Sequence, residues 1–313
     1  MAETNTKNGK TSKILVIGSS NTDMVVRAKQ LPRPGETVLG GKFVMVPGGK
    51  GANQAVSVAR LGGNLTFVCK VGDDVFGKQT LALLEKEGID TSYIFTDMEE
   101  ASGVALITVD EKAENCIAVA SGANANLTED DIKSIEQVID NADYILLQLE
   151  VPLETVEFVV RTAAGKGKKV VLNPAPAQSL SPELLAELYL VTPNETEAEM
   201  LSGVRITDER SACEAAKRLL EKGVEHVIIT LGSSGALYAG ADRMKLFPAY
   251  KVKALDTTAA GDVFNGALLV AMSEGCGWDE SIRFAAKAAA ISVTRLGAQS
   301  SVPNRSEVES FVQ

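Results

Sequence analysis

The sequence predicts a three-layer α/β/α domain with a mostly parallel central sheet. Short apolar runs rich in Val, Ile and Leu alternate with helical patterns along most of the chain. Continuous apolar runs are typical of parallel strands that are covered on both faces. Residues 22–46 and 103–121 break the alternation with hairpin patterns, and this predicts a second, small β-sheet.

The predicted elements follow one another in βαβ order. Strands are predicted at 14–17, 65–71, 144–149, 169–172, 190–192 and 227–230, and helices at 52–61, 78–86, 153–164, 182–188, 195–201 and 211–222. The C-terminal third is predicted to be helical at 261–273 and 279–294. A last short helix follows, which we expect Ser306 and Glu309 to cap.

The length and net charge of the chain limit its possible functions. A chain of 313 residues with 45% hydrophobic composition can bury a large core. A net charge of −10 argues against nucleic acid as a partner, because non-specific affinity for it comes from Lys and Arg. An acidic chain can still bind an anion locally through backbone N–H groups, Mg²⁺ and a few placed cations.

The N-terminus and the cysteines indicate a cytoplasmic protein. Residues 1–12 are polar with no apolar stretch behind them, which predicts a disordered tail and neither a signal peptide nor a membrane anchor. Cys69, Cys116, Cys213 and Cys276 are widely spaced, and we expect reduced, buried thiols.

The chain has a single histidine, His226. This removes most histidine-based nucleophilic and metal schemes, so a general base would have to be a carboxylate or a lysine. His226 opens an apolar strand pattern, which favours a structural role.

Two segments of small residues lead into helical patterns. Residues 256–262 read DTTAAGD and residues 47–55 read PGGKGANQA. Small residues let a backbone approach a phosphate closely, and a helix start offers unpaired N–H groups to it. An ordinary helix start with a capping Asp262 is the alternative for the first segment. Two such helix starts predict two binding positions, one for each end of the bound ligands.

A third segment, residues 192–199, places carboxylates on successive turns after a strand. Such oxygen ligands suit a metal that works with phosphates. Asn194 and Glu197 also have the spacing of an N-cap with its capping box, and the residues alone do not separate the two interpretations.

Two glycine motifs are set aside. Residues 72–79 approach a Walker A loop, but Gln79 stands where a Ser or Thr hydroxyl is needed, so we expect a plain strand-to-helix turn. Residues 18–21 lack the Gly-x-Gly-x-x-Gly pattern, which leaves dinucleotide binding unsupported.

Seven motifs in one order resemble the ribokinase-like (PfkB) family of carbohydrate kinases over essentially the whole chain after residue 12. They are GSSNTD at 18–23, GGKGANQ at 48–54, QLE at 148–150, NPAPA at 173–177, NETEAE at 194–199, TLGSSG at 230–235 and DTTAAGD at 256–262. The resemblance implies one kinase domain over 13–313, with the segments 22–46 and 103–121 forming a β-sheet lid over the substrate.

The resemblance also implies the catalytic groups. The catalytic Asp of the family falls on Asp262, which we expect to be the first helical residue and the general base. The backbone of Ala259, Ala260 and Gly261 would form the anion hole. Asn194 and Glu197 match the motif that holds Mg²⁺.

Further residues are implied as binding groups. The sugar contacts would be Asn21, Thr22, Asp23, Gly49, Lys50, Gly51, Ala52, Asn53, Glu150 and Asp262. The ATP contacts would be Asn194, Thr230, Leu231, Gly232, Ser233, Ser234, Gly235, Gly261 and Asp262. Taken singly, Lys50 and Glu150 could be solvated charges, Asn21 a turn residue and 230–235 a plain β-turn. The chain departs from the family at Ala286, where a His or Asn often contacts the adenine.

A monovalent-cation site is implied as well. Relatives hold K⁺ between two loops, here the residues Asp256, Thr258, Ser292, Arg295, Gly297 and Ser301. One carboxylate with several neutral oxygens suits a large monocation better than Mg²⁺. The alternative is that these residues simply end a strand and a helix.

The implied reaction is transfer of the γ-phosphoryl group of MgATP to O5 of D-ribose. Kinases of deoxyribose, fructose or a nucleoside on the same fold remain as alternatives, and a sugar-binding regulator without turnover is the non-enzyme alternative. We expect a cytoplasmic homodimer that associates through the lid.

Overall fold

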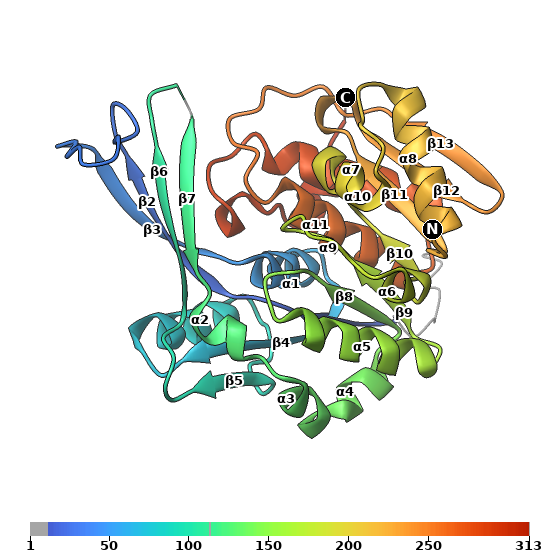
Figure 1. The fold of residues 1–313 in the computed structure, drawn as a ribbon, viewed down its shortest axis with the longest axis horizontal. Helices are drawn as coiled ribbons and strands as arrows, with labels where there is room; N and C mark the ends of the chain where they lie inside the picture. The colour runs from blue at the N-terminus through green and yellow to red at the C-terminus, as the bar shows by residue number, and fades with distance from the viewer. Residues whose placement is uncertain (1–11, 113, 313) are drawn as a thin grey trace, which may run out of the picture.

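The computed structural model describes residues 12–112 and 114–312. The expected tail therefore lies, apart from Ser12, outside the described residues. Figure 1 shows a large central sheet with helices packed on both sides and a smaller sheet that projects from it. No helix in the described part of the chain is long and apolar enough to cross a bilayer.

The central sheet has nine strands in the order β13-β12-β11-β10-β9-β8-β1-β4-β5. Their bounds are β1 Lys13–Ile17, β4 Asn64–Gly72, β5 Ile94–Asp97, β8 Tyr144–Leu147, β9 Lys169–Leu172, β10 Leu190–Val191, β11 His226–Thr230, β12 Ala236–Gly240 and β13 Arg243–Phe247. Neighbours from β11 to β5 are parallel, and β12 and β13 add an antiparallel edge. The predicted mostly parallel sheet is confirmed, whereas β5, β12 and β13 had not been placed from the sequence.

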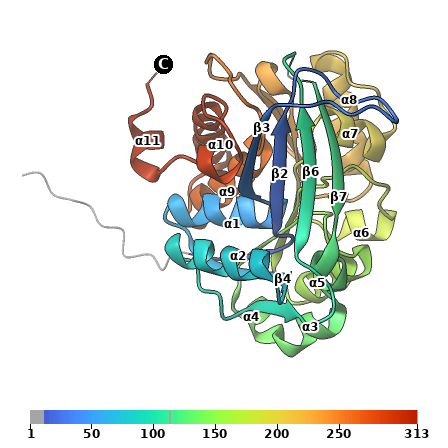
Figure 2. The same ribbon diagram turned by 90° about the vertical axis from the view of Figure 1, so that its left-hand side faces the viewer.

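Helices cover both faces of this sheet, as Figure 2 shows. One face carries α1 Lys50–Arg60, α2 Val75–Lys86, α9 Ala260–Ser273, α10 Trp278–Ser292 and α11 Arg305–Ser310. The other carries α3 Glu129–Ser134, α4 Glu136–Asn141, α5 Leu153–Gly165, α6 Pro182–Ala186, α7 Glu195–Ser202 and α8 Glu209–Glu221. The three predicted layers are confirmed.

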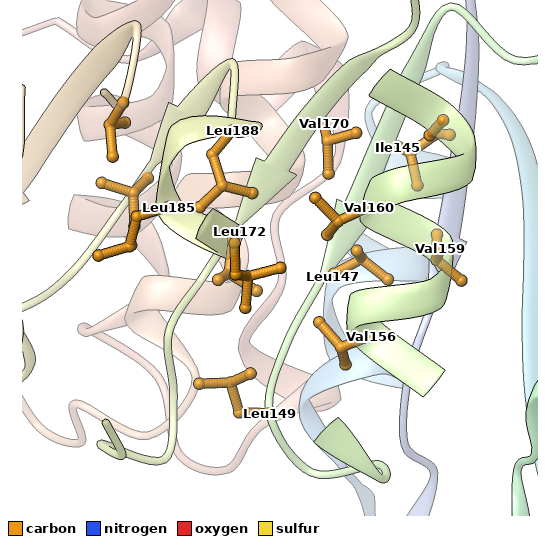
Figure 3. Close-up of a cluster of buried hydrophobic side chains, with 14 of the residues drawn as sticks. Ile145, Leu147, Leu149, Val156, Val159, Val160, Val170, Leu172, Leu185 and Leu188 are labelled. Carbon is orange, nitrogen blue, oxygen red and sulfur yellow. The ribbon is translucent and has the colours of Figure 1, made fainter. Parts of the chain in front are cut away.

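Two hydrophobic cores lie between these layers, because alternate side chains of a strand point to opposite faces. In β1, Leu15 and Ile17 belong to the core beneath α5 to α8, while Ile14 and Val16 belong to the core beneath α1, α9 and α10. Figure 3 shows part of the first core, where side chains of β8, β9, α5 and α6 interlock. Burial on both faces explains why these strands read as continuous apolar runs.

The small sheet consists of four strands in the order β3-β2-β6-β7. Their bounds are β2 Asn21–Arg27, β3 Lys42–Gly48, β6 Gly103–Val109 and β7 Asn115–Ala120. The pairs β2–β3 and β6–β7 are antiparallel, and β2 and β6 join them in parallel. A short 3-10 helix, η1 Gly122–Asn126, leads back from β7 into the domain. Both predicted hairpins are therefore present and form one sheet.

Three local predictions are wrong. Asn304 and Glu307 form the capping box of α11, and Glu309 instead pairs with Arg305 at 2.7 Å. Cys116 is exposed on β7, because that strand lies in the small sheet and not in the core, and Cys213 and Cys276 are only partly buried; Cys69 is buried as expected.

The start of α9 also differs from the prediction. The helix begins at Ala260, so Asp262 is its third residue and not its first.

Candidate active site

The predicted site residues gather at one edge of the central sheet. Strands β1, β8 and β10 end there and are followed by Asn21, Glu150 and Asn194 respectively, and Thr230 is the last residue of the parallel strand β11. The starts of α1 and α9 meet at the same edge, which is where open α/β sheets bind their ligands. Residues more than two hundred positions apart are thus brought into contact.

Asp262 lies at the centre of this edge and is 5% exposed. Its Oδ2 accepts a hydrogen bond from Nδ2 of Asn53 at 3.0 Å, and its Oδ1 accepts one from Nε2 of Gln54 at 2.9 Å. Burial raises the pKa of Asp262, and the charge of Lys50 together with these two hydrogen bonds acts in the opposite direction. Asp262 is therefore held in contact with α1 and is more than an end cap of its own helix.

The loop before Asp262 has an unusual backbone. Ala259 adopts φ 59°, the left-handed region, and is the one non-glycine residue in the described chain with a positive φ. The N–H of Ala260 donates to the carbonyl of Thr257 at 3.2 Å, so this N–H is engaged in a turn. In the described part of the chain the N–H groups of Ala259 and Gly261 donate to no protein acceptor. Of the three predicted donors, two are therefore available to an anion.

Space is available beside those donors. A Cβ built on Gly261 would meet no protein atom within 4 Å. Because a bulky side chain here would project into this space, a glycine keeps the helix start open to a ligand.

Glu150 is not a solvated charge. Its Oε2 accepts hydrogen bonds from Oγ of Ser19 at 2.6 Å and from the backbone N–H of Lys50 at 3.0 Å. The carboxylate thus holds the first turn of α1, whose N-cap Gly49 has φ 86° and cannot provide a side-chain cap.

The Lys50 side chain is partly buried among carboxylates. Burial lowers its pKa, but nearby carboxylates outweigh burial and raise the pKa above its ordinary value. They are Asp262, Glu150, Glu197 and Asp23. Lys50 is therefore an ammonium group at neutral pH, set between the predicted sugar contacts and the predicted metal residues.

Asp23 and Asn21 lie on β2, at the root of the small sheet. Burial, reinforced by Glu150 and Asp262, raises the pKa of Asp23 to about 6. A Cβ on Gly48 would come within 2.3 Å of Asp23 Oδ2, which explains the glycine in the paired strand. The charge at Asp23 is therefore sensitive to pH near neutrality.

Asn21 is positioned by a residue that the sequence analysis missed. Asn124 of η1 donates from Nδ2 to Oδ1 of Asn21 at 2.8 Å, and its Oδ1 accepts from the N–H of Ser20 at 2.9 Å. A single asparagine after a hairpin pattern gives no sequence signal.

Asn53 contributes a buried acceptor. Its Nδ2 bonds to Asp262, while its Oδ1 is buried without a partner in the described protein. A buried acceptor of this kind is costly unless a ligand satisfies it, and a sugar hydroxyl is a suitable donor.

Asn194 and Glu197 form the capping box of α7. Glu197 N–H donates to Asn194 Oδ1 at 2.9 Å, and Asn194 N–H donates to Glu197 Oε2 at 2.8 Å. Glu197 is 6% exposed, and burial raises its pKa. Among the residues that the structure describes, no cluster of three carboxylate, His or Cys groups could hold a metal by itself.

The predicted nucleotide turn lies beside this capping box. Thr230 N–H donates to the carbonyl of Pro193 at 2.9 Å, and Thr230 forms an isolated bridge with Asn194. The following turn closes with Leu231 N–H donating to Gly235 carbonyl at 2.8 Å, with Gly235 at φ 111°. Ala286 lies on α10 and is partly buried.

The two loops of the predicted cation site are joined by Asp256. Its Oδ1 accepts from Thr258 N–H and its Oδ2 from Gly297 N–H, both at 2.9 Å. Ser292 ends α10, Arg295 pairs with Glu307, and Ser301 lies in the 3-10 helix η3 Gln299–Ser301. The structure therefore places the carboxylate and both loops together next to the Ala259 turn.

Two predictions of structural roles agree with the structure. Asp74 caps α2 through Gly77 N–H at 2.8 Å, so residues 72–79 form a strand-to-helix turn. His226, at the start of β11, stacks against Tyr238 and lies in tilted contact with Trp278 at the opposite edge of the sheet.

Comparison with known proteins gives one consistent group. The family model described as pfkB family carbohydrate kinase matches residues 11–305. A ribokinase of Haemophilus influenzae is 47% identical over 96% of this chain and 98% of its own length. A deoxyribokinase of Salmonella typhi is 37% identical over 96% and 98% respectively. The structure of Arabidopsis thaliana ribokinase complexed with ribose and ATP is 30% identical, with a TM-score of 0.89 over 97% of this chain and all of that one.

Proposed function

The chain belongs to the pfkB family of carbohydrate kinases, and we propose that it phosphorylates D-ribose with ATP at O5, giving D-ribose 5-phosphate and ADP. The observation that supports this most is the position of Asp262. Its buried carboxylate lies between the free N–H groups of the α9 start and the polar side chains of α1, so a proton acceptor adjoins both a phosphate site and a hydroxyl site.

In the proposed step Asp262 takes the proton of the sugar hydroxyl. The hydroxyl oxygen forms a bond to the γ-phosphorus, and the bond between that phosphorus and the bridging oxygen breaks, so that ADP leaves with the electron pair. The N–H groups of Ala259 and Gly261 would stabilise the charge on the transferring group. Lys50, which stays protonated, adds a positive charge nearby.

The sugar would lie between β2 and α1. Asn21 and Asp23 from β2, Lys50 and Asn53 from α1 and the remaining oxygen of Glu150 offer both donors and acceptors to a polyol. The partner-free Oδ1 of Asn53 supports this placement, since a sugar hydroxyl would satisfy it.

ATP would occupy the other side, with its phosphates at the α9 start and the nucleoside along residues 230–235. Asn194 and Glu197 fit Mg²⁺ through its waters. Their capping box uses one lone pair on each carboxylate oxygen of Glu197, so each of these oxygens keeps a free lone pair that can accept from a metal-bound water. Mg²⁺, when bound, neutralises phosphate charge. Ala286 leaves adenine recognition to backbone and apolar contacts.

A monovalent cation would lie at the loops that Asp256 joins. Hydrogen bonds from Thr258 and Gly297 outweigh burial and lower the pKa of Asp256, so it is ionised at neutral pH. One fixed negative charge, joined by backbone carbonyls of the two loops, would suit K⁺. The residues proposed are Asp256, Thr258, Ser292, Arg295, Gly297 and Ser301.

The small sheet would act as a lid and as a dimer contact. Cross-strand register places Asp23 on one face, toward the site, and Val26 with Phe43 on the other. On that second face Phe43, Met45 and Leu106 are 58%, 46% and 55% exposed, which is unusual for large apolar groups and suits a second copy of the chain. Sedimentation of the Leu106→Lys variant tests the dimer contact, and we expect this variant to be monomeric.

ATP as co-substrate and four free thiols support a cytoplasmic location.

The deciding experiment compares kcat/KM on ribose, 2-deoxyribose, fructose and adenosine with MgATP, and identifies the product by phosphorus NMR. Ribose is expected to be the best substrate, phosphorylated at O5. A preference for 2-deoxyribose would mean that 2-deoxyribose, and not ribose, is the substrate. Sugar binding without turnover on any of the four compounds would favour the sugar-binding regulator.

A further inference from the structure

Gln54 occupies an unusual position for a polar side chain. It lies on α1 among apolar neighbours and is fully buried. A carboxamide in such surroundings is unfavourable unless all of its groups are hydrogen-bonded. Its Nε2 donates to Asp262 Oδ1 and to Asn173 Oδ1, and its Oε1 accepts from Nε2 of Gln148. Gln54 is thus fixed by the ends of β8 and β9 and in turn holds Asp262.

The same set of hydrogen bonds closes on the start of α9. Asn173 donates to the Thr192 carbonyl at 3.2 Å, Thr192 Oγ1 donates to Asn265 Oδ1 at 2.7 Å, and Asn265 Nδ2 donates to the Gly261 carbonyl at 2.9 Å. Asp262 and Gly261 are therefore tied to the sheet by one continuous chain of buried side chains. Such a chain fixes orientation, because no member can rotate without leaving a buried group unpaired.

We infer that Gln54 is a positioning residue for the proposed general base. It holds Oδ1 of Asp262 on the buried side and leaves Oδ2, which is shared with Asn53, as the oxygen that faces the sugar hydroxyl. The inference rests on the proposed function, since it assumes that Asp262 accepts the proton. It adds a residue that does not itself touch the substrate.

The hydrogen bond from Gln54 also stabilises the ionised carboxylate, so its loss raises the pKa of Asp262. The titratable groups around Asp262 that stay unchanged are Lys50, Glu150, Asp23 and Glu197. Asp23 titrates near pH 6 in the free protein, so its protonation affects ribose binding. The profile to measure is therefore the acidic limb of kcat at saturating ribose, where the sugar is already bound.

The experiment compares Gln54→Met and Gln54→Glu with Ser57→Ala. Gln54→Met keeps the side-chain volume but loses all three hydrogen bonds. Gln54→Glu keeps the acceptor for Gln148 and brings a second carboxyl group to Asp262. Ser57 is a matched control: it is fully buried on the same helix and donates to the Val263 carbonyl of α9 at 3.2 Å without touching Asp262.

Both Gln54 variants should lose at least about tenfold in kcat with little change in KM for ribose, and their acidic limb should move up by about one pH unit. Ser57→Ala should lower the melting temperature and leave the limb in place. A folded Gln54 variant with an unmoved limb overturns the inference, and so does loss of folding in both, which would make Gln54 a core residue only.

Asp262→Asn separates this inference from the proposed function. If that variant is inactive while the Gln54 variants keep the parental profile, the inference alone fails. If Asp262→Asn is fully active, the proposed mechanism fails and the inference fails with it.

Discussion

Asn53 and Asp262 are joined by a 3.0 Å hydrogen bond between Nδ2 and Oδ2. Asn53 lies in the first turn of α1 and Asp262 in the first turn of α9, so this bond connects the two helix starts that the sequence singles out. The predicted sugar end and the predicted phosphate end meet at one carboxylate. The following predictions depend on that arrangement.

Asp262→Asn should lower turnover by on the order of 10²–10⁴-fold, because the amide keeps the shape of the side chain but cannot accept the proton. Ribose binding, measured by calorimetry, should persist. Turnover within a few-fold of the parent would make Asp262 a structural cap.

Gly261→Ala should fold, since the added Cβ meets no protein atom, but it should lower turnover at least about tenfold by occupying the phosphate space. Gly165→Ala at the end of α5 is the matched control, because its Cβ is equally free and its φ is not positive. Both variants should melt slightly higher than the parent, by the usual gain of Gly→Ala in a helix. Equal activity of the two variants would contradict the anion hole.

Asp23 should make ribose binding weaken as pH falls through about 6, because protonation removes the acceptor for a sugar hydroxyl. The pKa of Asp23 is raised from 3.8 in the unfolded chain, so the folded state holds the proton between these values and loses stability as pH rises through them. Asp23→Asn should therefore stabilise the protein at pH 7, on the order of 1 kcal/mol, while weakening ribose binding. Denaturant melts and titration calorimetry at pH 5 and 7 measure both effects.

The cation site predicts faster turnover in K⁺ than in K⁺-free buffer or Na⁺ at constant ionic strength, because a bound cation would order the turn at Ala259. Asp256→Ala should abolish the difference, since it removes both the charge and the bond to Gly297. Equal rates in all three buffers would remove the site and leave the rest of the proposal in place.

The lid predicts slower amide exchange in residues 22–46 and 103–121 when ribose is present, because closure would order these segments over the sugar. Helix α8, remote from the site, serves as the internal reference. Unchanged exchange in both segments would leave the small sheet as a static dimer surface.

Much of the fold follows from local sequence. Burial on both faces makes each central strand a continuous apolar run, and small residues before α1 and α9 mark helix starts with open N–H groups. These signals lie within a few residues, so one sequence shows them. The edge strands β5 and β13 were missed, since short, partly exposed strands have no such run. Strand β12 was missed as well: it is buried, but its five residues include two Ala and one Gly. The N-cap of α11 was misplaced by two residues, which is the usual uncertainty at helix ends.

Only the tertiary structure showed how the site is held together. Gln54, Asn124 and Asn265 act through side-chain hydrogen bonds to residues that the fold brings to them, in the case of Gln54 from 208 positions away. A buried polar residue on an apolar helix face can be noticed in a sequence, but its partner cannot, because hydrogen-bond partners depend on which strand ends share an edge. The sequence by itself marked the strand ends and helix starts that carry the proposed catalytic and binding groups. The packing of α1 and α9 against those strand ends decided their geometry, since a buried hydrogen bond is favourable only when both groups arrive together.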